Sequence, residues 1–185
     1  MDVPRELIGG LERRTITVVA YDSGWPDRYE QQRLRIAGAL GSRADRIDHV
    51  GSTAVPGLAA KPIVDIDVSV EDPDDEPSFV PALEAAGYAL RVREPGHRML
   101  RSSALDVHVH VCATGSDWER RHLLFRDWLR VSEADRDRYA AAKKALASGE
   151  WPTMNDYADA KRAVIAEIMG RAEQWAAQSA WSPAG

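Results

Sequence analysis

Two segments of the chain alternate β-branched and polar residues, and they restrict the possible folds more than any other feature. In Lys61 to Val70, KPIVDIDVSV, the spacing predicts a strand with Asp65 and Asp67 on one face and valine and isoleucine on the other. A carboxylate buried in a sheet costs several kcal/mol unless a cation, a hydrogen-bond donor or water compensates it. The polar face of this strand therefore requires a partner.

The second segment, Leu105 to Cys112, LDVHVHVC, predicts a strand with Asp106, His108 and His110 on its polar face. If the two strands are neighbours in one sheet, facing side chains lie about 5 Å apart, close enough to share a cation. Carboxylates favour Mg²⁺ or Mn²⁺, whereas imidazole accepts Mn²⁺ more readily than Mg²⁺ and also suits Zn²⁺. The alternative is an exposed sheet face on which these side chains contact water.

The order of the remaining patterns predicts an α+β fold. Further strands are expected at 15–21, 46–50, 88–93 and 98–102, helices at about 25–40 and 78–86, and three consecutive helices at 117–129, 133–147 and 153–180. With 185 residues, of which 44% are hydrophobic and 29% charged, the chain is expected to form a single domain over 1–185. Within it, residues 15–112 form a mixed-sheet core and residues 117–180 a helical part.

Charge and cysteine content argue against several classes of partner. The formal net charge is −5, and no cluster of Lys and Arg is long enough to bind a polynucleotide or a membrane surface, so neither partner is expected. The single cysteine, Cys112, cannot form an intramolecular disulfide, and no apolar run approaches the ~20 residues of a membrane span. We expect a cytoplasmic protein, and the sequence does not indicate its oligomeric state.

A short loop before the acidic strand has the features of a phosphate site. Gly51 and Ser52 close the preceding strand and offer backbone N–H groups and a hydroxyl, as loops that bind phosphate oxygens do. Lys61 follows at the start of the acidic strand, where it either contacts a phosphate or pairs with an aspartate. The phosphate contact is preferred because the Gly-Ser loop is expected nearby.

Two aromatic and lysine pairs lie four residues apart on the predicted C-terminal helices: Tyr139 with Lys143, and Tyr157 with Lys161. Residues at this spacing share one face of a helix, so each pair presents an aromatic ring and an ammonium group together. The pairs either frame a substrate cleft or serve helix packing.

The block from His49 to Leu58, HVGSTAVPGL, followed by Lys61 to Val68, KPIVDIDV, resembles the signature of the GrpB family. That family is grouped with the nucleotidyltransferase superfamily, which has the DNA polymerase β-like fold. Looser matches at Tyr21 to Tyr29, YDSGWPDRY, and at Leu123 to Arg130, LLFRDWLR, extend the resemblance over most of the chain. The resemblance implies a nucleotidyltransferase-like mixed β-sheet core with flanking helices and a helical C-terminal part.

The resemblance also implies a site and a reaction. Gly51 and Ser52 would hold nucleotide phosphates, and Arg126 would contact substrate. The metal-binding and catalytic residues would be Asp65, Asp67 and His110, with Mg²⁺ or Mn²⁺ as the ion; the histidine stands where the superfamily has a third carboxylate. The implied reaction is in-line attack on an α-phosphate, which transfers an NMP group from a nucleoside triphosphate to a small-molecule acceptor.

Two other functions stay open at this point. The chain is either a non-catalytic nucleotide-binding module, in which the change from carboxylate to histidine has abolished transfer, or a phosphohydrolase that uses Asp65, Asp67, His108 and His110. Release of pyrophosphate, tight binding without turnover, and release of phosphate without an acceptor distinguish the transferase, the module and the hydrolase.

Overall fold

Six strands form one mixed sheet in the part of the chain that the computed structural model describes, residues 5–11, 16–149 and 151–183. Their order across the sheet is β1-β4-β5-β6-β3-β2, in which β3 and β6 pair in parallel and the other neighbours pair antiparallel. The strands are β1 (Glu6–Leu7), β2 (Arg46–Val50), β3 (Val64–Val70), β4 (Tyr88–Glu94), β5 (His97–Ser102) and β6 (Val107–Ala113).

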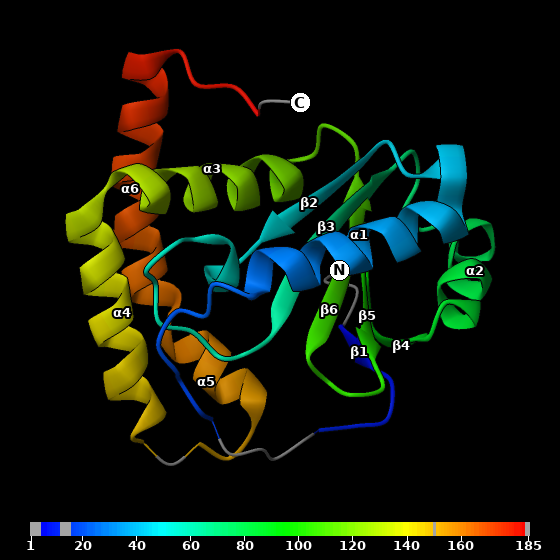
Figure 1. The fold of residues 1–185 in the computed structure, drawn as a ribbon, viewed down its shortest axis with the longest axis horizontal. Helices are drawn as coiled ribbons and strands as arrows, with labels where there is room; N and C mark the ends of the chain where they lie inside the picture. Colours follow the sequence, from blue (N-terminus) through cyan, green and yellow to red (C-terminus); the bar gives the residue numbers. More distant parts are fainter. Residues whose placement is uncertain (1–4, 12–15, 150, 184–185) are drawn as a thin grey trace.

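Six α-helices accompany the sheet in the described residues, and most of them follow the last strand, as predicted (Figure 1). They are α1 (Trp25–Leu40), α2 (Val80–Ala85), α3 (Asp117–Val131), α4 (Glu133–Ala147), α5 (Met154–Ala160) and α6 (Arg162–Ser179). Ser116 and Ser132 cap α3 and α4, since each side chain accepts a hydrogen bond from a backbone N–H in the first turn. Within the described residues, no helix is long and apolar enough to cross a membrane.

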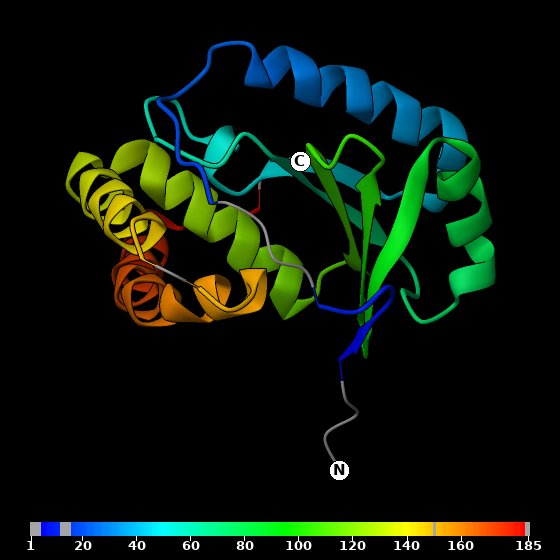
Figure 2. The ribbon, with the colours of Figure 1, turned by 90° about the horizontal axis from the view of Figure 1, so that it is seen from below.

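The apolar face of β3 packs against α1, and Figure 2 shows α1 on one side of the sheet and α3 to α6 on the other. Val64, Ile66 and Val68 are 0% exposed and form one core cluster with Trp25 and Ile36 of α1. The strict alternation of β3 therefore divides its side chains between two faces as the sequence predicts. The mixed sheet with segregated C-terminal helices confirms the α+β fold.

The polar face of β3 lies beneath α3. Ser69 is 0% exposed and donates a hydrogen bond to Glu119 of α3, and Asp67 is 1% exposed beside the same helix. The alternative of an open, water-covered sheet face is therefore wrong for this half of β3. Side chains from α3 supply the partners that the buried polar atoms require.

Two predicted elements differ from the structure. Residues 16–21 do not form a strand: Val19 makes an isolated bridge to Ala60, and the predicted first residue, Thr15, lies outside the described part of the chain. Pro62, two residues after Ala60, has no N–H group, so the ladder cannot extend in that direction. The helix predicted at 153–180 is divided into α5 and α6, with Lys161 between them.

Candidate active site

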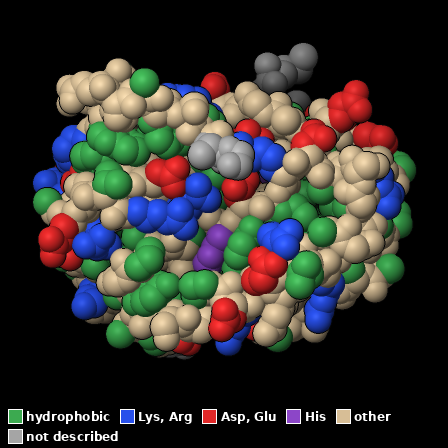
Figure 3. Space-filling model, turned by 45° about the horizontal axis from the view of Figure 1, so that its top comes forward, with side chains coloured by type: hydrophobic (Ala, Val, Ile, Leu, Met, Phe, Trp, Pro, Cys, Tyr) green, Lys and Arg blue, Asp and Glu red, His purple; other side chains and the backbone are tan. Residues whose placement is uncertain are grey.

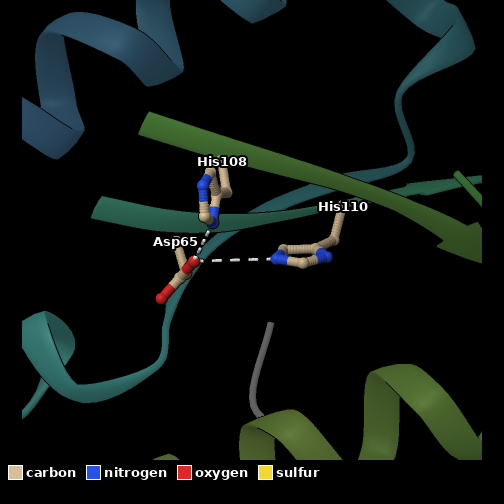
Figure 4. Close-up of side chains that lie close together, drawn as sticks. All are labelled: Asp65, His108 and His110. Carbon is tan, nitrogen blue, oxygen red and sulfur yellow. Dashed lines mark ion pairs between the residues drawn. The ribbon is translucent and has the colours of Figure 1, made fainter. Parts of the chain in front are cut away.

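The carboxylate of Asp65 lies between two imidazole rings from the neighbouring strand (Figure 4). β3 and β6 pair with Asp65 opposite His108 and Asp67 opposite His110, so the polar stripes of the two strands meet. Asp65 Oδ1 is 3.2 Å from His108 Nδ1 and 3.6 Å from His110 Nε2. One ligand atom from each of these three residues lies within 4.8 Å of the others, so the cluster can hold a single metal ion.

Hydrogen bonding decides the charges in this cluster. Burial by itself raises the pKa of Asp65, but hydrogen bonds from His108 and His110 outweigh it and hold that pKa well below its usual range. Burial lowers the pKa of His110, but the hydrogen bond to Asp65 and the negative charges of Asp65, Asp67 and Glu94 together outweigh it and leave the pKa raised. Asp65 is therefore ionised, and its negative charge favours a bound cation. A metal ion bound there would replace the proton that His110 otherwise shares with Asp65.

Asp67 takes a different partner from Asp65. His122 of α3 places its Nδ1 atom 3.1 Å from Asp67 Oδ1 and 2.8 Å from Asp67 Oδ2. The predicted metal ligands were Asp65, Asp67 and His110, whereas the structure gathers Asp65 with His108 and His110 and leaves Asp67 to His122. The reason is the arrival of α3 over the second half of β3, which no spacing within the strand reveals.

Gly51 approaches Asp65 so closely that only glycine fits. Its φ is +71°, and a Cβ atom at this position would lie 2.6 Å from Asp65 Oδ2. Both the backbone conformation and the contact therefore exclude a side chain. Gly51 and Ser52 line the same cleft as Asp65, which places the predicted phosphate loop beside the candidate metal cluster.

A cleft of about 360 Å³ opens beside the cluster, within the range of small-molecule sites. Its walls come from the sheet, from the loop before β3 and from the C-terminal helices. The predicted site residues that line it are Gly51, Ser52, Lys61, Asp65, His108, His110, Tyr139, Lys143, Tyr157 and Lys161.

Lys61, Lys143 and Lys161 converge on this cleft from separate parts of the chain. Lys143 is 3% exposed and donates a hydrogen bond to the carbonyl oxygen of Ala59. Burial, followed by the charges of Lys161 and Lys61, lowers the pKa of Lys143 to about 7. Burial, followed by the charge of Lys61, lowers the pKa of Lys161 to about 8. Like charges in a poorly solvated space create a strong demand for an anion.

Two tyrosines stand among these lysines. The ring centroid of Tyr157 is 5.2 Å from Lys61 Nζ and 4.8 Å from Lys161 Nζ, and that of Tyr139 is 4.6 Å from Lys143 Nζ. The Tyr157 side chain is 0% exposed, and its hydroxyl has no hydrogen-bond partner among the described residues. Since an unpaired buried hydroxyl costs about 1–3 kcal/mol, this group is suited to donate to an oxygen of a bound ligand.

Arg126, for which the resemblance implied a substrate contact, does not line the cleft. Its Nε donates to Asp127 Oδ1 at 2.8 Å, its Nη1 donates to the carbonyl oxygen of His49 at 3.2 Å, and Asp48 lies 3.7 Å away. The guanidinium is therefore neutralised by carboxylates of β2 and α3. The structure therefore does not bring Arg126 to the cleft, and its contact with substrate stays a prediction.

His97 of β5 is a member of the site region that no sequence pattern marks. Its Nε2 lies 3.0 Å from His110 Nδ1, its Nδ1 lies 2.6 Å from Glu94 Oε1, and its ring stacks on Trp118 at 3.9 Å. The available signal was its place on the strand next to the His-x-His strand. His97 contacts His110 and His122 contacts Asp67, but neither pair belongs to one local motif. The sequence therefore predicted no role for either histidine.

The fold and the cleft together define a class of α+β proteins in which the parallel strand pair of a mixed sheet carries an Asp/His cluster and C-terminal helices add lysines. The sequence model of the GrpB protein family matches residues 15–171. The chain therefore belongs to the GrpB family, as its sequence block predicted.

Relatives and a solved structure agree with this assignment. The chain is 52% identical over 167 residues to UPF0157 protein SCO7215 of Streptomyces coelicolor. The matched region covers 90% of this chain and 89% of that protein. The crystal structure of conserved protein GrpB from Enterococcus faecalis matches with a TM-score of 0.75 at 30% identity, over 86% of this chain and 99% of that one. A dephospho-CoA kinase of Mycolicibacterium paratuberculosis is 29% identical over 202 residues, which span 94% of this chain and 50% of the kinase.

Proposed function

We propose that the protein is a metal-dependent nucleotidyltransferase, which transfers an NMP group from a nucleoside triphosphate to a small-molecule acceptor. The supporting observation is that a candidate metal cluster and three lysines line one cleft. A triphosphate that carries a divalent cation requires this combination, because the cation needs anionic or imidazole ligands and the phosphate oxygens need ammonium groups. A metal cluster without lysines, or lysines without a metal cluster, would account for only one half of such a ligand.

The residues present fit a divalent cation, since Asp65 is an anion and His108 and His110 add nitrogen ligands. Bound there, the ion would polarise the phosphoryl oxygens and the leaving pyrophosphate. Gly51 and Ser52 border the ion site and would orient the phosphate chain, as backbone N–H groups and hydroxyls do in phosphate loops.

The lysines would neutralise the phosphate oxygens, and the unpaired hydroxyl of Tyr157 would donate to one of them. In the reaction, an oxygen of the acceptor forms a bond to the α-phosphorus, the bond from that phosphorus to the pyrophosphate group breaks, and the proton of the acceptor passes to water. The chain contributes positioning and charge stabilisation, which carry most of phosphoryl-group transfer.

A small acceptor fits the charge of the surface better than a polynucleotide does. On the face that Figure 3 shows, basic, acidic and apolar side chains are interspersed, and no continuous basic track of the kind that a nucleic acid needs crosses that face.

The test is mass spectrometry of nucleoside triphosphates incubated with the protein, Mg²⁺ or Mn²⁺ and a metabolite extract, with pyrophosphate measured in parallel. Asp65→Ala and His110→Ala, which remove two of the candidate metal ligands, are expected to abolish or strongly reduce pyrophosphate release and the nucleotidylated product. Asp27→Ala, which removes an exposed carboxylate in the first turn of α1, is the matched control. Identical products from wild type and both site variants would refute the transferase. Phosphate without pyrophosphate would identify a hydrolase, and binding without turnover a nucleotide-binding module.

A further inference from the structure

Four side chains, joined by three contacts, form a series that runs from the end of β4 to the candidate metal cluster. Glu94 Oε1 lies 2.6 Å from His97 Nδ1, His97 Nε2 lies 3.0 Å from His110 Nδ1, and His110 Nε2 lies 3.6 Å from Asp65 Oδ1. The order is carboxylate, imidazole, imidazole, carboxylate. Each ring nitrogen in the chain faces one partner.

The hydrogen-bonding capacities of these groups fix the direction of the chain. The Glu94 carboxylate can only accept, so His97 Nδ1 must carry a proton and donate it. A neutral His97 then has its lone pair on Nε2, which accepts from His110 Nδ1. A neutral His110 is therefore held as the tautomer whose lone pair is on Nε2, the atom that faces Asp65.

His97 is also fixed in place by packing. The ring is 4% exposed, and it stacks on Trp118 of α3 with an interplanar angle of 21°. A histidine that is clamped between a tryptophan face and a carboxylate has little rotational freedom. It can therefore hold His110 in one orientation, which is the role that supporting residues have behind metal-binding histidines.

We infer that Glu94 and His97 are positioning residues for His110, and that Asp65, His108 and His110 consequently select a first-row transition-metal ion over Mg²⁺. Two of the three ligands are imidazoles, which suit Mn²⁺, Co²⁺ and Zn²⁺, whereas Mg²⁺ demands oxygen ligands. The fixed orientation of His110 strengthens this preference, because its Nε2 atom already faces Asp65 and has only to give up the proton that it shares with that carboxylate when the ion binds. The inference rests on the proposed function for the role of the ion, but the binding itself is measured without nucleotide.

The experiment titrates the full chain with Co²⁺, Mn²⁺, Zn²⁺ and Mg²⁺ by calorimetry and records the visible absorption of bound Co²⁺. Co²⁺ is expected to bind one to one, more tightly than Mg²⁺, and His108→Ala is expected to abolish the absorption band. His97→Phe keeps a ring against Trp118 but removes the acceptor, so it is expected to lower Co²⁺ affinity about 10–100-fold. His97→Gln, whose amide oxygen replaces Nε2 as acceptor, is expected to recover most of that loss.

His49→Phe is the matched control, because His49 stacks on Tyr29 of α1, hydrogen-bonds Thr53 and offers no atom to the cluster, and burial lowers its pKa to about 4, so that it adds no charge near Asp65 at pH 7. It is expected to leave Co²⁺ affinity unchanged, and circular dichroism verifies that each variant is folded. Equal affinity for Mg²⁺ and Co²⁺, or wild-type affinity in His108→Ala, would overturn the metal assignment. Unchanged affinity and spectrum in folded His97→Phe would overturn the positioning role. Pyrophosphate release without selective Co²⁺ binding would defeat this inference alone, and selective Co²⁺ binding without transfer would defeat the proposed function alone.

Discussion

The close contact of Gly51 with Asp65 makes Gly51→Ala a test of how the phosphate loop and the metal cluster are joined. The φ of Gly51 is +71°, and an added Cβ would lie 2.6 Å from Asp65 Oδ2 and 3.1 Å from Asp65 Cβ. The substitution therefore imposes backbone strain and a collision at once. Asp65 cannot yield freely, because His108 and His110 hold its other oxygen.

The two costs can be separated with a second glycine. A non-glycine residue in a sparsely populated backbone region costs about 1–3 kcal/mol, and overpacking of a close contact costs about 1–3 kcal/mol more. Gly57 also has a positive φ, +79°, but a Cβ there would meet nothing within 4 Å. Gly57→Ala is therefore expected to show the strain alone, and Gly51→Ala is expected to lose a total of about 2–6 kcal/mol in the free energy of unfolding.

Urea denaturation of both variants and the wild type measures this difference, and Co²⁺ titration measures the displacement of Asp65. The Gly51 variant is expected to be the less stable of the two and to bind Co²⁺ more weakly. Gly38→Ala, at an exposed position in the last turn of α1 where an added Cβ meets nothing within 4 Å, is the positive control and is expected to stabilise by about 0.4–1 kcal/mol. If Gly51→Ala and Gly57→Ala lower the free energy of unfolding equally and both keep wild-type Co²⁺ affinity, the close contact of Gly51 with Asp65 contributes neither to stability nor to ion binding, and the reasoning is refuted.

Three further predictions concern charges at the site. Lys143→Met is expected to raise the free energy of unfolding below pH 7, and this gain is expected to disappear as the pH approaches 10.5. The reason is that folding lowers the pKa of Lys143 from 10.5 to about 7, so that between these two pH values the unfolded chain holds a proton that the folded chain has lost. Urea titrations across this range check it, and a difference independent of pH would contradict it. Affinity for a nucleoside triphosphate is expected to fall as the pH rises through about 8, where Lys161 loses its proton, and Lys161→Met is expected to weaken this dependence in calorimetry; a flat profile in the wild type would count against the lysine site. His122→Ala leaves the Asp67 carboxylate, 1% exposed, without its donor and is expected to cost about 1–3 kcal/mol in urea denaturation, whereas His122→Asn keeps an N–H donor and is expected to cost less; equal losses would show that the hydrogen bond is not the cause.

The architecture was predictable because its strongest signals are local. The alternation in β3 and β6 assigns each side chain to a face without knowledge of the rest of the chain, and the run of helical patterns after Ala113 separates the helical part from the sheet. The strand expected at 15–21 failed for the opposite reason. A strand exists only where a neighbour offers a ladder, and the backbone beside Val19 offers a bridge at Ala60 followed by Pro62.

The candidate site was predictable in part. The loop, the acidic strand, the His-x-His strand and the two tyrosine and lysine pairs were all visible as motifs, and the structure places them around one cleft. The sequence could not supply the register of β3 against β6, which sets Asp65 opposite His108. It also could not supply contacts between separate elements, such as His122 on Asp67 or His97 on His110.

The division of the two aspartates also bears on how many ions the cleft can hold. Taken as a motif, Asp65 and Asp67 form one unit, but Asp65 borders the cleft while Asp67 is 1% exposed and has both oxygens within 3.1 Å of His122 Nδ1. A second ion would need Asp67 to leave His122, and it would also need further anionic ligands where the strand offers the imidazole of His110. Under the proposed function, the arrangement therefore favours a single ion at Asp65, and the ammonium groups of Lys143 and Lys161 would supply the positive charge that a second metal ion would otherwise bring to the phosphates.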